Sequence, residues 1–248
     1  MKQIPNLFTL LNLVFGCVAI KFILQPETAF LSSGGKVVTS GMLTGGFLLL
    51  CAAVVDFLDG FVARLFKATS AMGEQLDSLA DAVSFGVAPG MILYRLLQAG
   101  YSDHSNATEW WYLPAIIFPC AAVWRLAKFN LDKEQRYYFK GLPTPAAGLT
   151  AASLPAIAYS GSEAMNQLIF TPAVIYTVII IISWLMISNL PIISLKFQSY
   201  TLKANIDKLL LAIIALLAIL IFKWAAVPVV LVAYVIVSLI FKPNKEKI

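Results

Sequence analysis

The chain has 248 residues, of which 60% are hydrophobic and only 12% are charged. Soluble domains carry about 25% charged residues, so this composition excludes an ordinary soluble protein and indicates one that is embedded in a membrane. The formal net charge of +5 does not indicate a nucleic-acid partner, because the basic residues are spread among short loops.

Apolar stretches that are long enough to cross a bilayer as helices number about eight. They lie at about residues 5–24, 40–66, 75–98, 110–130, 144–160, 168–188, 206–222 and 224–241. The sequence therefore predicts an all-α, polytopic membrane protein with one domain over residues 1–248. We expect a catalytic core over about residues 4–188 and a C-terminal helical hairpin over about residues 206–241.

An even number of spans places both termini on the same side of the membrane. Of the 18 Lys and Arg residues, four would then lie on the opposite side: Lys21, Lys36, Arg95 and Lys223. Because the cytoplasmic side carries the excess of basic residues, this asymmetry predicts cytoplasmic termini. We expect an integral protein of the cell (inner) membrane, surrounded by membrane lipids, with its active site facing the cytoplasm.

Four aspartates lie at the cytoplasmic ends of the second and third expected spans: Asp56, Asp59, Asp77 and Asp81. Residues three or four apart lie on one face of a helix, so each pair forms one stripe. Four carboxylates at membrane depth would repel one another and cost several kcal/mol unless cations compensate them. Mg²⁺ and Mn²⁺ prefer oxygen ligands, so the sequence predicts a metal site.

The aspartates belong to the string Asp56-x2-Asp59-Gly60-x2-Ala63-Arg64-x8-Gly73-x3-Asp77-x3-Asp81. This string resembles the signature of the CDP-alcohol phosphotransferases, D-x2-D-G-x2-A-R-x8-G-x3-D-x3-D. The resemblance implies a membrane enzyme, a homodimer, in which an alcohol hydroxyl displaces CMP from a CDP-linked lipid. It also implies that the four aspartates hold Mg²⁺ or Mn²⁺, two ions in all, and that Asp81 is the catalytic base. A polar cluster without catalysis is the alternative.

The only histidine of the chain supports a carboxylate as the base. His104 lies in a loop that we expect on the exterior side, across the membrane from the aspartates. No cysteine belongs to the motif either, so proton transfer at the site is expected to fall to an aspartate.

The small residues of the motif have two possible roles. The resemblance implies that Gly60, Ala63 and Gly73 let the nucleotide of the CDP-lipid approach the helices. Close packing between helices is the alternative, because small residues mediate it in membranes. Arg64 could pair with a phosphate or with a neighbouring aspartate, or it could serve only as a topology signal.

Three further stretches resemble one branch of the family, the CDP-diacylglycerol–serine O-phosphatidyltransferases. They are residues 4–12 (IPNLFTLLN), residues 84–90 (SFGVAPG) and the segment from RLAKFN at 125–130 to KGLPTPAA at 140–147. With the aspartate string, the resemblance covers roughly residues 4–150. It implies that the substrates are CDP-diacylglycerol and L-serine and that the products are phosphatidylserine and CMP.

Polar residues near the motif are candidates for substrate binding. Asn6, Thr9 and Asn12 recur every third residue and form one stripe on the first span. The stripe could bind a cytosine or ribose edge, or it could serve in helix capping and packing. Candidates for binding the diphosphate or the serine carboxylate are Arg125, Lys128, Asn130 and Lys140; an ordinary positive-inside loop is the alternative for these residues.

Two other functions are considered beside serine transfer. The acceptor could be glycerol 3-phosphate or an inositol phosphate, which should demand more cationic side chains at the cytoplasmic mouth. A cation transporter could also use aspartates, but transport sites lie near the midplane of the membrane. We expect a direct in-line displacement with both substrates bound, and a covalent phosphatidyl-aspartate is the competing scheme.

Overall fold

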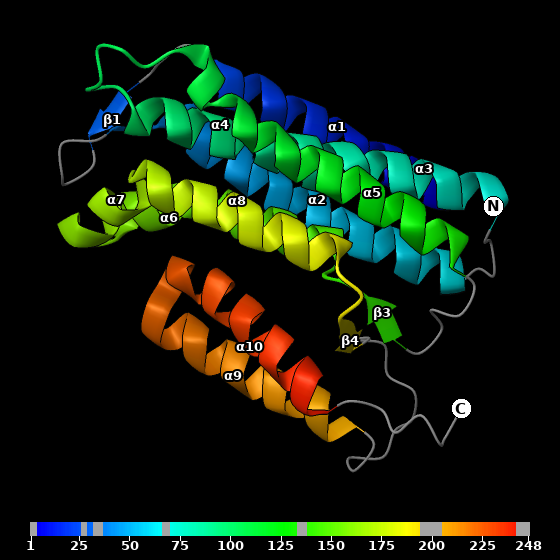
Figure 1. Cartoon of the computed structure of the whole chain (residues 1–248). Coiled ribbons are helices and arrows are strands. Elements are labelled where there is room, and N and C mark those ends of the chain that lie inside the picture. The colour runs from blue at the N-terminus through cyan, green and yellow to red at the C-terminus, as the bar shows by residue number, and fades with distance from the viewer. Residues whose placement is uncertain are drawn as a thin grey trace.

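The computed structural model describes residues 4–25, 29–31, 37–65, 70–132, 138–193 and 205–241. Figure 1 shows that these residues are mostly helical, as predicted for a polytopic membrane protein. The helices are α1 (Ile4–Leu24), α2 (Ser40–Leu65), α3 (Ala71–Asp81), α4 (Ala88–Gly100), α5 (Ile117–Leu131), α6 (Thr144–Ser160), α7 (Glu163–Ile169), α8 (Pro172–Ile187), α9 (Ile206–Phe222) and α10 (Ala226–Ile240). Shorter helical segments are the π-helical η1 (Ala82–Val87) and the 3₁₀ segments η2 (Glu109–Trp111), η3 (Leu113–Ile116) and η5 (Lys223–Ala225).

Two short strand pairs were not predicted. Strand β1 (Ala29–Leu31) pairs antiparallel with β2 (Val37–Thr39), and β3 (Tyr138–Lys140) pairs antiparallel with β4 (Pro191–Ile193). Each strand has three residues, too few for an alternating pattern to be read from the sequence. The second pair fixes the chain before α6 to the chain after α8.

The predicted count of about eight spans is not confirmed. Among the described residues, five helical runs are long and apolar enough to cross a membrane, or six if α7 and α8 form one bent span. Helix α6, with 17 residues, is shorter than the about 20 residues that a transmembrane helix usually has, and it is not one of these runs. Residues 206–240 are one of these five runs, because their apolar sequence is continuous. Figure 1 shows that this run folds back on itself as the two helices α9 and α10.

The expected span at 168–188 is interrupted near its start. Helix α7 ends at Ile169, α8 begins at Pro172, and their axes differ by 63°. Proline has no backbone N–H and cannot continue the hydrogen bonds of the preceding helix, so Pro172 starts a new helix instead. Ser162 caps α7 by accepting a hydrogen bond from the backbone N–H of Met165.

Helices α3 and α4 form one continuous run, which is widened at η1, directly after Asp81. Pro89 cannot donate to the carbonyl four residues earlier, and the N–H of Ala88 bonds to the Val83 carbonyl, five residues earlier. The Ser84 hydroxyl donates to the backbone carbonyl of Asn12 at 3.0 Å. The widened turn is therefore joined to α1 beside the aspartates.

The core lies among α1, α2, α4, α5, α6 and α8, and large apolar side chains also cover the outer surface. Fully buried residues include Phe85, Leu93, Leu96 and Phe118, whereas Phe47, Ile180 and Ile221 are exposed. An apolar outer surface is expected when the surroundings are lipid rather than water.

The C-terminal hairpin of α9 and α10 lies on one side of the helical bundle, where α10 and η5 contact α6 (Figure 1). Its attachment to the bundle includes two polar contacts with β4. The Tyr234 hydroxyl donates to the Ile193 carbonyl at 2.7 Å, and the Ile193 N–H donates to the Ser238 hydroxyl at 3.2 Å. Both bonds satisfy backbone groups of β4 that would otherwise lack partners within the protein.

The turn before α6 requires glycine, and we predict that Gly141→Ala destabilises the protein. Gly141 has a φ of +84°, and an added Cβ would lie 2.4 Å from the carbonyl oxygen of Met186. The substitution should lower the free energy of unfolding by about 1–3 kcal/mol. Thermal unfolding in detergent micelles measures this effect. Gly60→Ala is the control, because a Cβ there has no atom within 4 Å, and equal melting of the two variants would contradict the prediction.

Candidate functional site

Three carboxylates from two helices converge at the cytoplasmic side of the predicted topology. Asp56 and Asp59 lie on α2 and Asp77 lies on α3, and one carboxylate oxygen from each lies within 4.8 Å of the others. Asp59 is buried, and the other two are partly buried. A set of oxygen donors at this spacing fits a hard divalent cation such as Mg²⁺ or Mn²⁺.

The start of α3 is fixed by its own cap. The Ser70 hydroxyl accepts a hydrogen bond from the backbone N–H of Gly73 at 3.0 Å, which satisfies one of the free donors of the first turn. Asp77 and Asp81 follow one and two turns later on the same helix. The cap therefore helps to set how far both carboxylates extend toward α2.

Asp81 is buried beside the three grouped carboxylates and is not one of them. The amide nitrogen of Asn12 donates to its carboxylate at 3.3 Å. Electrostatic interactions link Asp81 to Asp56 and Asp77, and Arg125 on α5 faces it as the nearby cation. Its surroundings thus differ from those of the three grouped aspartates.

The polar stripe of α1 contacts the aspartates. The Thr9 hydroxyl donates to Asp59 at 2.9 Å, one turn before the bond from Asn12 to Asp81. Asn6 lies next to Gly73, because a Cβ at that glycine would come within 3.1 Å of its side-chain oxygen. The contacts of Thr9 and Asn12 with carboxylates were not predicted, although the three-residue spacing placed these side chains on one face.

The two glycines of the motif have different surroundings. Within the described part of the chain, a Cβ at Gly60 would meet no atom within 4 Å, whereas Gly73 is close to Asn6 and Ser70. Gly60 therefore borders open space beside Asp59, and packing between helices does not account for it. The side chains of Ala63 and Arg64 lie outside the described residues.

Among the four residues predicted to bind serine or phosphate, Arg125 is the one that interacts electrostatically with Asp81. Arg125 is buried, and its Nη1 donates to the Thr144 hydroxyl at 3.3 Å. Its Nε is buried and has no hydrogen-bond partner among the described residues, and the guanidinium carbon lies 5.1 Å from the centroid of the Phe129 ring. A planar guanidinium with a free edge suits a carboxylate or a phosphate.

The other three predicted residues bond to protein groups. Lys128 donates to the Ile187 carbonyl and to Asn189, both in the segment at the end of α8. The Asn130 amide donates to Ser78 at 2.9 Å, which joins α5 to α3 beside Asp77. Lys140 forms an ion pair with Asp132 at 2.6 Å.

The site also contains residues that the sequence did not indicate. A cavity of about 930 Å³ extends from Asp56 between α2, α6 and the C-terminal hairpin. Its lining includes Asp56, Phe57, Pro143, Leu211 and Tyr234. Tyr234 also faces Arg125. The hairpin sequence is generically apolar, so the sequence carried no signal for this contribution.

These groups together form an acidic cluster, a buried cation and an apolar cavity at one end of the bundle. Clustered carboxylates that hold divalent ions bind diphosphates through those ions. The buried guanidinium can bind a second anionic group beside Asp81. The adjoining apolar cavity can hold hydrocarbon. This combination fits a ligand with a phosphorylated head and a lipid tail.

Comparison with known proteins finds several similar sequences that share one name. The chain is 34% identical over 166 residues to a CDP-diacylglycerol–serine O-phosphatidyltransferase of Mycobacterium leprae. The aligned region covers 63% of this chain and 48% of the relative. Proteins with the same name from Bacillus subtilis (34% over 155 residues, 60% of this chain, 73% of the relative) and Helicobacter pylori strain 26695 (29% over 203 residues, 80% and 75%) are also similar. The match thus spans about half the length of the mycobacterial relative.

A family model covers most of the chain. The model of the CDP-alcohol phosphatidyltransferases matches residues 2–202, which include the acidic cluster, the stripe on α1 and Arg125. The C-terminal hairpin lies beyond the matched residues. The chain belongs to the CDP-alcohol phosphatidyltransferase family.

Proposed function

We propose that the protein transfers the phosphatidyl group of CDP-diacylglycerol to the hydroxyl of L-serine, giving phosphatidylserine and CMP. The single observation that carries this proposal is the acidic cluster of Asp56, Asp59 and Asp77 beside the buried Asp81 and Arg125. The names of the similar proteins support serine as the acceptor. The homodimer and the presence of two ions stay predictions.

The acidic cluster is proposed to bind the diphosphate of CDP-diacylglycerol. With Mg²⁺ or Mn²⁺ bound, the site would neutralise the diphosphate and stabilise the charge that develops on the departing CMP. Asp56, Asp59 and Asp77 are the proposed ligands, and Thr9 orients Asp59 through its hydrogen bond. The open space beside Gly60 leaves room for the nucleotide to lie against α2.

Asp81 is proposed to be the general base, placed by Asn12. The serine hydroxyl is a weak nucleophile while it is neutral, so a base must accept its proton during the attack. The serine oxygen then bonds to the β-phosphorus, the bond from that phosphorus to the bridging oxygen breaks, and CMP leaves. Asp81 receives the proton, and Arg125 holds the serine carboxylate close to it.

The cations at the site favour serine over an acceptor that carries a phosphate. Arg125 is buried beside Asp81, whereas Lys128 and Lys140 are engaged by Asn189 and Asp132. One guanidinium suits the single carboxylate of serine, whose ammonium group needs no further cation. Glycerol 3-phosphate or an inositol phosphate would bring a more highly charged group.

An acceptor panel tests the proposed function. The purified full chain should be incubated with CDP-diacylglycerol, Mg²⁺ or Mn²⁺, and either L-serine, glycerol 3-phosphate or inositol 1-phosphate, followed by lipid analysis and CMP measurement. We expect phosphatidylserine and an equal amount of CMP, and no activity with EDTA. If lipid product formed only with another acceptor, that alcohol would replace serine as the proposed acceptor. Cation flux in proteoliposomes without lipid turnover would favour a transporter.

Substitution of the grouped carboxylates tests whether each of them is needed for turnover. Asp56→Asn, Asp59→Asn and Asp77→Asn should each lower the turnover rate by at least ~10²-fold, the scale of removing a main electrostatic stabiliser. The matched control is Asp103→Asn, which changes an exposed aspartate in the loop after α4. Near-normal turnover in any of the three variants would remove that residue from the metal site.

The space beside Gly60 gives a second, more local prediction. Gly60→Ala should not lower the melting temperature, because its Cβ meets no atom of the described residues and alanine favours a helix more than glycine does, but it should obstruct a nucleotide that lies against the helix. Overpacking of about 1–3 kcal/mol corresponds to a fall in kcat/KM of roughly 5- to 150-fold. Steady-state kinetics with varied CDP-diacylglycerol measures this effect. Unchanged kinetics would mean that the nucleotide binds elsewhere.

We also propose that both termini and the acidic site lie on the cytoplasmic side of the membrane, where serine is available. In a background of Cys17→Ala, Cys51→Ala and Cys120→Ala, a Ser102→Cys variant should react with a membrane-impermeant maleimide added to intact cells. An Ile248→Cys variant should react only after the cells are opened. The reverse labelling pattern would invert the topology that the basic residues predict.

A further inference from the structure

An apolar groove continues from the acidic site along α2 and α6. The cavity of about 930 Å³ that borders Asp56 is followed by a second cavity of about 330 Å³. Residues common to both linings are Leu149, Trp224 and Val227. Because they share these walls, the two cavities form the near and far sections of one groove.

The groove has a length suited to a long hydrocarbon chain. Along α2, the lining extends from Asp56 in the near section back to Leu43 in the far section. This stretch of helix rises about 20 Å, which exceeds the roughly 15 Å depth of one bilayer leaflet. Trp224 of η5 lines both sections of the groove.

Three hydroxyl groups that line the groove donate hydrogen bonds to backbone carbonyls. The Thr150 hydroxyl donates to the Ala146 carbonyl at 2.8 Å, and the Ser153 hydroxyl donates to the Thr150 carbonyl at 2.8 Å. The Tyr234 hydroxyl donates to β4. The walls therefore present mainly hydrocarbon to an occupant, and they end at carboxylates suited to a phosphorylated head.

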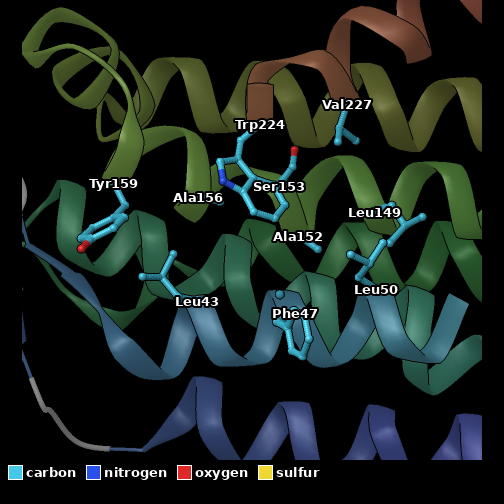
Figure 2. Close-up of a pocket in the computed structure, with 11 residues that line it drawn as sticks. Leu43, Phe47, Leu50, Leu149, Ala152, Ser153, Ala156, Tyr159, Trp224 and Val227 are labelled. Atoms are coloured by element: carbon cyan, nitrogen blue, oxygen red, sulfur yellow. The ribbon is translucent and has the colours of Figure 1, made fainter. Parts of the chain in front are cut away.

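Trp224 lines the groove where the two sections meet. Figure 2 shows its indole projecting from the C-terminal hairpin toward α6, near Ser153 and Ala156, with Phe47 on the α2 side. Lys223, just before it, has a φ of +51°, the one positive φ among the described non-glycine residues. Such a conformation persists where its surroundings hold it, so the turn places Trp224 in a defined position.

We propose that one acyl chain of the lipid substrate lies in this groove and that Trp224 holds its distal half. This inference rests on the proposed function, because it takes the head of the lipid to be at the aspartates. It assigns a role in substrate selection to the C-terminal hairpin, which lies outside the residues that the family model matches. A long chain contacts Trp224 and reaches the far section, whereas a short chain ends in the near section.

The consequence is a preference for long chains that depends on the far section. Ala156 lines that section, so Ala156→Phe should fill it, and Trp224→Ala should remove its wall. Each variant should lower the ratio of kcat/KM for dipalmitoyl over dioctanoyl CDP-diacylglycerol by at least ~10-fold, because several methylene contacts are lost. For Ala156→Phe, activity with the dioctanoyl substrate should stay near that of the unmodified protein, because Ala156 lines only the far section, and this also shows that the variant folds.

Kinetics should be measured in mixed micelles at equal surface concentration of each substrate. Trp184→Ala is the matched control, because Trp184 on α8 is exposed and lines neither section. Its chain-length ratio should not change. An unchanged ratio in both Ala156→Phe and Trp224→Ala would mean that the groove holds bulk membrane lipid only, and it would overturn the inference while leaving the proposed function intact.

Photolabelling tests the same inference without turnover. Palmitoyl CDP-diacylglycerol with a diazirine at the chain terminus should label the α6 peptide that contains Tyr159 in the unmodified protein and not in Ala156→Phe. The label is located by mass spectrometry of the digested protein. Labelling of that peptide without phosphatidyl transfer would support the groove and reject the proposed function. Labelling confined to other helices would reject the groove.

Discussion

Carboxylates brought together from two helices of a membrane protein impose the constraint on which the rest of this structure depends. Asp56, Asp59 and Asp77 have oxygen atoms within 4.8 Å of one another. Such a group is costly in a poorly solvated setting, so the surrounding helices must supply donors and the site must attract cations. The hydrogen bond from Thr9 to Asp59 and the bond from Asn12 to Asp81 meet part of this need.

The residues of the acidic site come from parts of the chain that are distant in sequence. Helices α2 and α3 carry the carboxylates, α1 orients two of them, and α5 brings Arg125 to Asp81. The widened segment η1 bonds to α1 through Ser84, immediately after Asp81. A site assembled in this way keeps its geometry because two of its carboxylates, Asp59 and Asp81, are held by donors on α1 rather than by their own helices.

The head and the tail of the proposed lipid substrate meet different physical surroundings. Charged groups gather at Asp56 and Arg125, and the groove that begins there is lined by hydrocarbon. The C-terminal hairpin completes this groove with Trp224 and attaches to the bundle through Tyr234 and Ser238. The arrangement would let binding energy from the apolar chain hold the diphosphate in place for the reaction.

The sequence by itself determined the membrane class, the positions of the long apolar helices and the aspartate motif, because hydrophobic stretches and residue spacing are local properties. It also placed Thr9 and Asn12 on one face. Only the tertiary structure decided that this face meets Asp59 and Asp81, since the rotation of one helix against another is not encoded in spacing. The bend between α7 and α8 and the three-residue strands were likewise missed. Above all, the groove beside Trp224 arises from side chains far apart in the chain, and their apolar character is indistinguishable from that of a surface facing lipid.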